Sequence, residues 1–315
     1  MNEIWTMGEI LVEIMRPKAD MQLYDAGEFL GPYPSGAPAI FIDTVARLGH
    51  SAAIIGGVGA DDFGKCLLER LKKDGVDCTH VITVPGISTA VAFVTYFEDG
   101  SRKFIYHIGN TPAAMAKSPN ISEIDDPKYF HIMGCSLMAN DGFYKEIIAT
   151  MEKFVAKGAK VSFDPNIREE LLNGRDINDI VGSVMKYCSV LLPGEEELLL
   201  ITGEKTIKAA VNKVLNNGIT EIIALKQGSR GCTVYMKDME FSLGVYKVDQ
   251  VDATGAGDSF DAAFLCGLLE NKSLMECAKI ATAAAALNTS AFGPMEGDIS
   301  ISNVTKVMEE KSINC

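Results

Sequence analysis

The sequence predicts an α/β protein whose doubly wound, mostly parallel sheet is flanked by helices. Two observations support this class. Short β-type runs alternate with segments of helical periodicity, which is the pattern of βαβ units, and two β-rich hairpins interrupt that alternation. A chain of 315 residues can still form one core of this class. We therefore expect a single domain over residues 1–315, with a small antiparallel β lid formed by roughly residues 10–34 and 88–110.

The alternating elements begin with an apolar run at residues 52–57 that ends in glycines. Residues 61–73 follow it and repeat apolar side chains at the spacing of one helix face. Further β-type runs are expected at residues 129–133, 160–164, 189–192 and 221–225. Helices are expected between them at residues 141–157, 177–186, 195–202 and 206–216. Because parallel strands need long crossover connections, this order predicts parallel pairing.

The two hairpins are expected to form the lid. Residues 91–97 and 103–107 are β-rich and are joined by Glu98-Asp99-Gly100-Ser101, a typical hairpin connection. Residues 8–16 and 21–29 have the composition of strands around a short turn that contains proline. We interpret both hairpins as one flap inserted into the larger domain, because no repeat or linker composition separates them from it.

Composition and charge exclude several classes of protein. Hydrophobic residues make up 47% and charged residues 23%, as in soluble globular proteins, so the chain is not intrinsically disordered. The net charge of −13 opposes binding to nucleic acid. No stretch of about 18 apolar residues could span a membrane, and the N-terminus does not resemble a signal peptide. The eight cysteines include no CxxC pair, which favours a reducing compartment, and we predict a cytoplasmic protein.

Residues 248–269 carry the clearest chemical signal. A β-type run leads into the sequence DATGAGD (252–258), and a helix follows. Small residues let a phosphate approach the backbone, and the first turn of a helix offers unpaired N–H groups and the positive end of the helix dipole. Asp258 would lie beside that phosphate, where it could accept the proton of an attacking hydroxyl. The alternative is that Asp258 only caps the helix and the glycines only form a tight turn.

A second glycine-rich segment looks like a phosphate loop at first. Residues 59–66 (GADDFGKC) follow a β-type run and open a helix, but Cys66 stands where a P-loop has the Ser or Thr that binds Mg²⁺. Asp61 and Asp62 would also place two carboxylates against the phosphate. We therefore interpret the segment as a turn and a helix cap. Asp62 also stands where a GxGxxG motif needs its third glycine, so a Rossmann cofactor site is not expected.

Several motifs in a fixed order resemble those of the PfkB, or ribokinase-like, carbohydrate kinases, a family that includes bacterial sugar kinases. The stretch DATGAGDSF (252–260) is similar to the family's C-terminal signature, and SGAPAIFIDTVARLG (35–49) is similar to its N-terminal glycine signature. The further matching blocks are GGVGADDFG (56–64), DPNIR (164–168), LLPGEEELLLITG (191–203) and LKQGSRG (225–231). The resemblance covers nearly the whole chain and implies an ATP-dependent sugar kinase with the family's α/β fold and β lid.

The resemblance also implies roles for particular residues. Asp258 matches the catalytic base, and the backbone of Gly255, Ala256 and Gly257 matches the anion hole for the transferring phosphoryl group. The other implied positions are Lys226, Gly228 and Gly231 for the nucleotide, Glu197 for Mg²⁺ through water, Asp252 and Thr254 for a monovalent cation such as K⁺, and Glu13, Gly36, Tyr106, His107, Arg168 and Asp258 for the sugar. ATP and Mg²⁺ are the implied cofactors. The lid is expected to close over the sugar and to pair two subunits into a homodimer.

Departures from the family pattern bear on the substrate. Gly194 stands in place of the Asn of the family's Asn-x-x-Glu element, Ile40 replaces a common sugar-binding Asn, and Glu13 replaces the more common Asp. The stretch GPYPSGAPAIFID (31–43) resembles a variant found in some bacterial ketose kinases. A neutral ketohexose of the fructose or tagatose type is therefore the first expectation.

Other substrates and one other class of protein stay open. Arg168 and Tyr106 align with residues that grip the acid substrate of 2-keto-3-deoxygluconate kinases, although His107 replaces the Arg of that subgroup. A sugar acid is therefore the second expectation and a nucleoside the third. A regulatory protein that binds sugar or nucleotide without catalysis is the remaining alternative. The intact glycine turn and Asp258 argue against it, because a protein without catalysis does not need that carboxylate.

Overall fold

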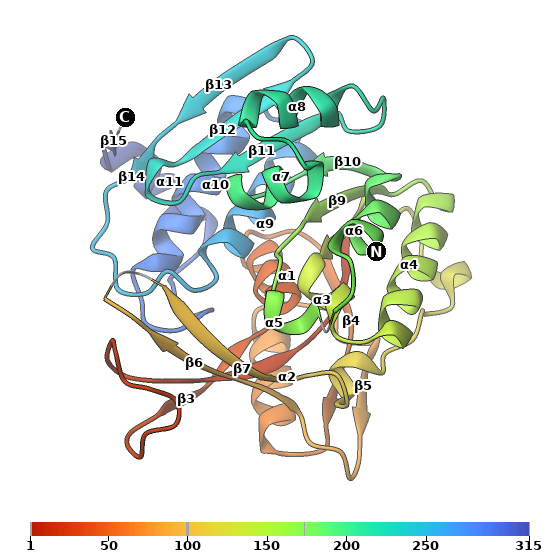
Figure 1. Ribbon diagram of the computed structural model, residues 1–315, viewed down its shortest axis with the longest axis vertical. Coiled ribbons are helices and arrows are strands. Elements are labelled where there is room, and N and C mark those ends of the chain that lie inside the picture. The colour runs from red at the N-terminus through yellow and green to blue at the C-terminus, as the bar shows by residue number, and fades with distance from the viewer. Residues whose placement is uncertain (1, 99–100, 173, 315) are drawn as a thin grey trace.

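The central sheet of the protein has nine strands and confirms the α/β class (Figure 1). The computed structural model describes residues 2–98, 101–172 and 174–314. In spatial order the strands are β13 (Met239–Leu243), β12 (Cys232–Met236), β11 (Ile222–Lys226), β10 (Cys188–Leu191), β9 (Lys160–Asp164), β8 (Tyr129–Met133), β1 (Ile4–Met7), β4 (Ala52–Gly59) and β5 (Val81–Val84). Every pairing from β11 to β5 is parallel, whereas β12 and β13 add an antiparallel edge.

Both faces of the parallel strands are buried, which explains their nearly continuous apolar sequences. In β11, Ile222 and Ala224 pack into one hydrophobic layer, while Ile223 and Leu225 pack into the other. Successive side chains of a strand point to opposite faces, so a strand covered by helices on both sides must be apolar at every position. The sheet is therefore the middle of three layers.

The helices fall into two groups, one on each face of the sheet. The first hydrophobic layer is completed by α1 (Ala37–Arg47), α2 (Asp62–Lys73), α9 (Ala256–Leu269), α10 (Leu274–Thr289) and α11 (Ile301–Glu310). The second is completed by α3 (Gly134–Met138), α4 (Asp141–Ala156), α5 (Glu169–Leu172), α6 (Ile177–Met185), α7 (Glu195–Thr202) and α8 (Ile207–Leu215). In Figure 1, α4 and α6 lie at the right of the sheet and α10 and α11 at the left.

The strand order reverses next to β1. The chain passes from β1 to β4 and β5 on one side, and then returns to β8 and β9 on the other side. In sheets of this kind, ligands bind at the carboxyl ends of the strands near such a reversal. Asp164 is the last residue of β9 and Lys226 the last of β11, so both lie at that edge.

The lid is a separate four-stranded sheet, seen along the lower left of Figure 1. Its strands are β3 (Leu30–Ser35), β2 (Leu11–Met15), β6 (Ala90–Tyr96) and β7 (Arg102–His107). The two outer pairings are antiparallel, as expected, whereas the central pairing of β2 with β6 is parallel. Asp99 and Gly100 of the expected hairpin turn lie outside the described residues.

The strand expected at residues 21–29 is wrong, and the strand that pairs with β2 begins at Leu30 instead. The cause is Arg16, a fully buried residue at the end of β2. Its guanidinium donates hydrogen bonds to the backbone carbonyls of Gln22, Asp25 and Glu28. Three carbonyl groups that converge on one guanidinium require a curved backbone, so the segment wraps around the arginine as a loop.

The β-type run expected before residue 252 is also wrong. No strand covers residues 248–251, and the preceding strand, β14 (Val245–Tyr246), ends earlier and pairs with β15 (Ile313–Asn314). The remaining short elements are 3-10 turns at Pro112–Ala114, Ile121–Glu123 and Gly228–Arg230.

The loop at residues 59–66 is a helix cap, as expected. The Asp61 carboxylate accepts the N–H of Gly64 at 2.8 Å and both the N–H and the hydroxyl of Thr89. An aspartate so occupied fixes the start of α2 and places a carboxylate where a phosphate loop would offer N–H groups.

Two further observations concern the location of the protein in the cell. Within the described part of the chain, no helix has the length and apolar character needed to cross a membrane. The cysteines of the described residues are unpaired. The cytoplasmic location stays a prediction.

Candidate active site

Two cavities meet at the N-terminus of α9. The first, which we call the lid cavity, lies under the lid and has a volume of about 310 Å³. The second, which we call the α10 cavity, lies beside β14 and α10 and has a volume of about 490 Å³. The residues that line both are Lys226, Gly228, Ala253 and Gly257. A reaction between two ligands, one in each cavity, would take place at this junction.

The glycine turn forms the junction, and its two glycines are needed for different reasons. Gly255 has a φ of 78°, and a Cβ built on it would lie 2.4 Å from the carbonyl oxygen of Pro294. It is therefore required by its own backbone. A Cβ on Gly257 would lie 3.7 Å from Lys226 Nζ and would otherwise point into open space. Gly257 thus keeps the junction free for a ligand, while Ala256 opens α9 and lines the α10 cavity.

Asp258 does not cap its helix. Gly255 occupies the N-cap position and makes no side-chain cap bond, while the carboxylate of Asp258 turns away to the lid cavity. There Asn166 Nδ2 donates to Asp258 Oδ1 at 3.3 Å. Burial raises the pKa of Asp258 to about 7, Asp164 adds to the rise, and Lys226 opposes it. A carboxyl group with this pKa can accept a proton near neutral pH.

Two carboxyl groups hold the ammonium group of Lys226 at the junction. Its Nζ donates to Asp164 Oδ2 at 2.7 Å and to Asp261 Oδ2 at 2.9 Å. Burial alone would lower the pKa of Lys226, but these two carboxyl groups hold it above its usual range. Burial and the charge of Asp164 raise the pKa of Asp261, whereas Lys226 holds the pKa of Asp164 below its usual range against the effect of burial. The group therefore keeps an ionised Asp164 beside a charged Lys226.

The wall of the lid cavity next to β2 holds Glu13 and Gly36. Ser35 donates its hydroxyl to Glu13 Oε1 at 2.7 Å, while Oε2 is buried and has no hydrogen-bond partner among the described residues. Burial raises the pKa of Glu13 to about 7. Gly36 has a φ of 102° and begins α1, where a Cβ would lie 2.5 Å from the carbonyl oxygen of Glu9. Ile40 of α1 also lines this wall, so the side chain there offers only packing.

The lid contributes alternate residues of β7 to the cavity. Arg102, Phe104 and Tyr106 line it, and the rings of Phe104 and Tyr106 stack with their centroids 5.1 Å apart. Arg168 faces them from the main domain. Burial alone would lower the pKa of Arg168, but Tyr106 and the acidic groups nearby hold it above its usual range, so the guanidinium stays charged.

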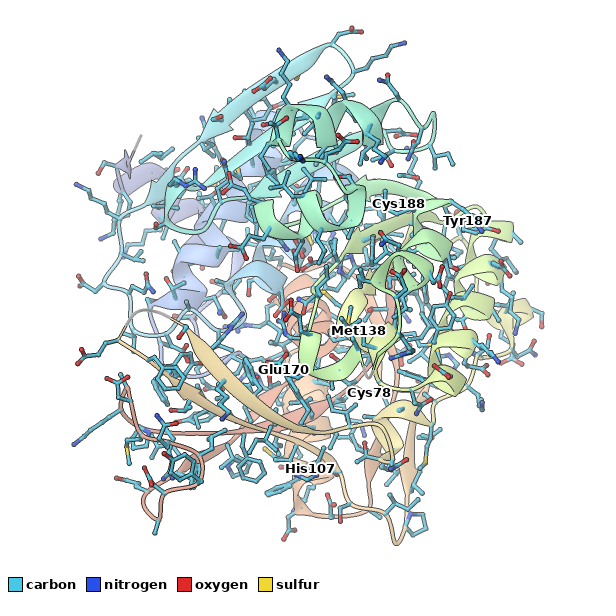
Figure 2. All side chains as sticks on the ribbon, in the orientation of Figure 1. Cys78, His107, Met138, Glu170, Tyr187 and Cys188 are labelled. Carbon is cyan, nitrogen blue, oxygen red and sulfur yellow. The ribbon has the colours of Figure 1, made fainter. Side chains whose placement is uncertain are left out.

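His107 does not line the lid cavity, unlike the other residues expected to bind the sugar. It is exposed and meets the ring of Phe93 edge to face at 6.3 Å. Figure 2 labels it at the lower side of the lid. Because side chains alternate along a strand, the residue after Tyr106 must point to the outer face.

Glu197 and the pair of Asp252 and Thr254 lie at the expected places, but backbone groups already engage them. Glu197 lines the lid cavity, and its oxygens accept the N–H groups of Ile167 at 2.9 Å and Gly194 at 2.7 Å. Burial and the charge of Asp164 raise the pKa of Glu197. It is therefore a half-buried residue that caps α7, not a fully solvated residue at a helix start.

Asp252 holds the loop before the glycine turn. Its Oδ1 accepts the N–H and the hydroxyl of Thr254, at 2.9 and 2.8 Å, and its Oδ2 accepts the N–H of Gly293 at 3.0 Å. The hydroxyl of Tyr96, on the lid strand β6, also contacts the Thr254 hydroxyl. Among the described residues, no group of three or more His, Cys, Asp or Glu side chains could hold a metal ion by itself.

The α10 cavity is mostly apolar. Gly228 and Gly231 line its edge, and Gly231 has a φ of 94° with its Cα packed against β13, where a Cβ would lie 2.0 Å from the carbonyl oxygen of Leu243. The apolar wall consists of Val245, Tyr246, Val248, Phe260, Ala285 and Ala286. Such a wall suits a flat organic ring better than a charged group.

Some lining residues escaped the sequence analysis. Arg102 and Phe104 could have been found from Tyr106, since residues two and four positions earlier on a strand share its face. Asn166 stands between Asp164 and Arg168 in the DPNIR block, yet only the structure shows that its side chain reaches Asp258.

Transfer of a phosphoryl group from a nucleotide to a hydroxyl needs two adjoining cavities, an anion site where they meet and a base on the acceptor side. The fold and the site together define a kinase of this class. The family model for pfkB carbohydrate kinases matches residues 3–300, and the chain belongs to that family. It is an ATP-dependent sugar kinase.

Named relatives are similar over nearly the whole chain. Fructokinase-1 of Zea mays is 33% identical, with 97% of each chain covered, and a probable fructokinase-2 of Arabidopsis thaliana is 34% identical over 86% of this chain and 83% of its own. A candidate ribokinase II of E. coli, solved with ATP and Mg²⁺, is 35% identical with a TM-score of 0.87, covering 98% of this chain and 99% of its own. A Vibrio cholerae fructokinase, 24% identical with a TM-score of 0.82 and coverage of 98% and 99%, shares the fold.

Proposed function

We propose that the protein transfers the γ-phosphoryl group of ATP to a hydroxyl of a ketohexose of the fructose or tagatose type. Relatives named fructokinases that are 33% identical over nearly the full length support this substrate class. Asp258 carries the proposal, because it is a buried carboxylate of the lid cavity, directly after Gly257 at the junction, with a pKa of about 7.

In the proposed reaction, Asp258 takes the proton from the attacking hydroxyl. The backbone N–H groups of Gly255, Ala256 and Gly257, at the start of α9, would stabilise the charge that develops on the phosphoryl group. The N–H of Ala256 donates to the Ala253 carbonyl at 3.3 Å in this structure and would have to turn to the phosphoryl group. No side chain blocks this approach, since Gly257 leaves the junction open. The lid excludes water, which would otherwise compete with the sugar for the phosphoryl group.

The sugar is proposed to bind between the lid and α1. The free Oε2 of Glu13 is a buried acceptor without a partner among the described residues, which a sugar hydroxyl would supply. Gly36 leaves backbone accessible beside it, and Tyr106 and Arg168 close the opposite wall. Ile40 contributes packing alone, in agreement with a recognition pattern that differs from that of relatives with Asn at this position.

The nucleotide is proposed to lie in the α10 cavity. Its base would contact the apolar wall, and its phosphates would pass Gly228 and Gly231 to reach Lys226 at the junction. Mg²⁺ bound with ATP would neutralise phosphate charge, and Glu197 could hold water molecules of that ion at the edge of the lid cavity. Asp252 and Thr254 would hold a monovalent cation such as K⁺ beside the glycine turn.

We also propose a homodimer formed through the lid. The outer face of β7 exposes Ile105, which is 45% accessible, next to His107. The particle mass in solution, measured by light scattering, tests this.

A sugar acid is the second candidate substrate, and one observation favours it. Arg102 from the lid and Arg168 from the main domain both line the lid cavity. Two guanidinium groups could bind a carboxylate, as a 2-keto-3-deoxygluconate-type acid requires. Arg102 thus supplies the second cation that His107 does not.

The test is ADP release from Mg-ATP with ketohexoses, 2-keto-3-deoxygluconate, ribose and nucleosides, each with wild type and Asp258→Asn. We expect turnover on one ketohexose and a fall in kcat of about a thousandfold or more in the variant, with ATP binding retained. Turnover on the acid that Arg168→Ala abolishes selectively would replace the first substrate by the second. Turnover on a nucleoside alone, or ATP binding without turnover on any acceptor, would contradict the proposal.

A further inference from the structure

Asn166 is a buried residue of the lid cavity that the proposed reaction does not yet use. It follows β9 within the DPNIR block and is 7% exposed. Its φ is 37°, in the left-handed region that favours glycine and that asparagine adopts more readily than most other residues. A backbone conformation of this kind persists only where the surrounding contacts impose it, and at a site it often serves a function.

Asp164 imposes that conformation. The backbone N–H of Asn166 donates to Asp164 Oδ1 at 3.1 Å, which closes a turn two residues long. The side-chain Nδ2 then lies 3.4 Å from Asp164 Oδ2 and 3.3 Å from Asp258 Oδ1. Both neighbours are carboxyl groups, so the donor end of the amide faces them, and it also contacts Met133 Sδ at 3.9 Å. The amide Oδ1 is buried and has no hydrogen-bond partner among the described residues.

A continuous network of hydrogen bonds leads from this amide into the core. Asp164 is held by Lys226, and Lys226 is held by Asp261. Asp258 and Asp261 are three residues apart and so lie on one face of α9. The network therefore runs from Asp258 to Asp261 on the same helix. It connects that helix to the ends of β9 and β11.

We propose that Asn166 is a positioning residue for Asp258, whose amide holds the carboxylate toward the sugar hydroxyl. This rests on the proposed role of Asp258 as base. The N-cap of the helix is Gly255, which has no side chain, and Asp258 lines the lid cavity instead. Among the described residues, the Asn166 amide donates a hydrogen bond to the Asp258 carboxylate. Without it, the side chain can rotate back toward the unpaired N–H groups of the first turn.

Two substitutions separate this role from a structural one. Asn166→Gly removes the amide while allowing the positive φ, so the backbone can stay as it is. Asn166→Asp keeps the shape but places a second acceptor against Asp258. We expect both to lower kcat about 10- to 100-fold, the loss typical of a hydrogen bond to a charged group, while the KM for ATP stays within about twofold. Thermal unfolding of each variant checks that it is folded.

The pH profile of kcat supplies a readout that a structural role would not move. The charged groups that face Asp258 are Asp164, Lys226, Arg168 and Arg102, and both variants keep all of them. In the wild type, activity should fall as the pH drops below about 7, because protonated Asp258 cannot accept a proton. A donated hydrogen bond favours the ionised form, so its loss should move this limb to higher pH, and further in Asn166→Asp than in Asn166→Gly.

Carbon-13 NMR of the aspartate carboxyl groups, with Asp258→Asn to assign the signal, follows the same titration without turnover. We expect the midpoint of Asp258 to rise in Asn166→Gly. A folded variant with an unchanged midpoint, or with lowered kcat and an unmoved pH limb, would overturn the positioning role. Full turnover in Asp258→Asn would overturn the base instead, and the NMR midpoints would then show whether the amide contact exists, so the two failures are distinct.

Discussion

The two cavities that meet at the glycine turn are lined by side chains of opposite chemical character. Ionisable side chains from several elements line the lid cavity, namely Glu9, Glu13, Asp164, Glu197, Asp258, Arg102, Arg168 and Lys226. The α10 cavity is lined mainly by glycine, alanine and apolar side chains. Burying a charged group costs free energy of folding unless the group is paired, so the lining of the lid cavity lowers stability more than that of the α10 cavity. Ionisable groups gathered in this way are typical of a functional site.

The difference shows where the chemistry is concentrated. Burial raises the pKa of both Asp258 and Glu13 to about 7, and both belong to the lid cavity. Carboxyl groups with a pKa near 7 can exchange protons with a substrate. A cavity that only binds a nucleotide does not require such groups. Substitutions on the two sides should therefore affect different kinetic constants, with the largest losses at the junction.

At the junction, Gly257→Ala should lower kcat more than substitutions in the wall of either cavity, although less than Asp258→Asn. Its methyl group would enter the space through which the phosphoryl group passes, while the nearest atom, Lys226 Nζ at 3.7 Å, leaves it room. We expect kcat to fall about 100-fold or more with an unchanged melting temperature. Kinetics and thermal unfolding measure the two effects.

Gly255→Ala is the matched control. Its Cβ would meet the Pro294 carbonyl oxygen at 2.4 Å in a left-handed backbone, so this variant should lose about 1–3 kcal/mol of unfolding free energy. If Gly257→Ala lost stability as well, or kept full turnover, the junction would not be the open passage that we infer.

On the nucleotide side, Ala286→Leu should raise the KM for ATP about tenfold and leave the KM for the sugar unchanged. Ala286 lines the α10 cavity and is 7% exposed, so a larger side chain there fills space that the base would occupy. Initial rates with each substrate varied in turn measure both constants. An equal rise in both would show that the cavities are not independent.

On the lid, substitutions of the neighbouring residues Tyr106 and His107 should have clearly different effects on the KM for the sugar. These effects are expected to be the smallest of the set. Tyr106→Ala should raise the KM for the sugar several-fold, because it removes a stacked ring from the cavity wall. His107→Ala should change neither KM by more than about twofold, since its side chain lies on the outer face. A sugar defect in His107→Ala as large as that in Tyr106→Ala would contradict the assignment of the two faces.

Local patterns predicted most of the α/β body. The runs at residues 129–133 and 160–164 and the helix at 195–202 match β8, β9 and α7 residue for residue. A strand covered on both faces has to be apolar throughout, and this requirement is visible in the sequence. Residues 21–29 failed because their backbone bonds the distant guanidinium of Arg16, and composition does not show such a partner.

The sequence by itself determined the class of fold, the family, the glycine turn and the identity of Asp258 as the carboxylate beside it. These depend on residues close together in the chain, whose spacing and chemistry can be read directly. Only the tertiary structure decided that Asn166 reaches Asp258, that Lys226 pairs with Asp164 and Asp261, and that Arg102 rather than His107 enters the cavity. Those contacts join residues up to 92 positions apart. They depend on strand order and on the face that each strand turns to the cavity, which packing sets and local sequence does not.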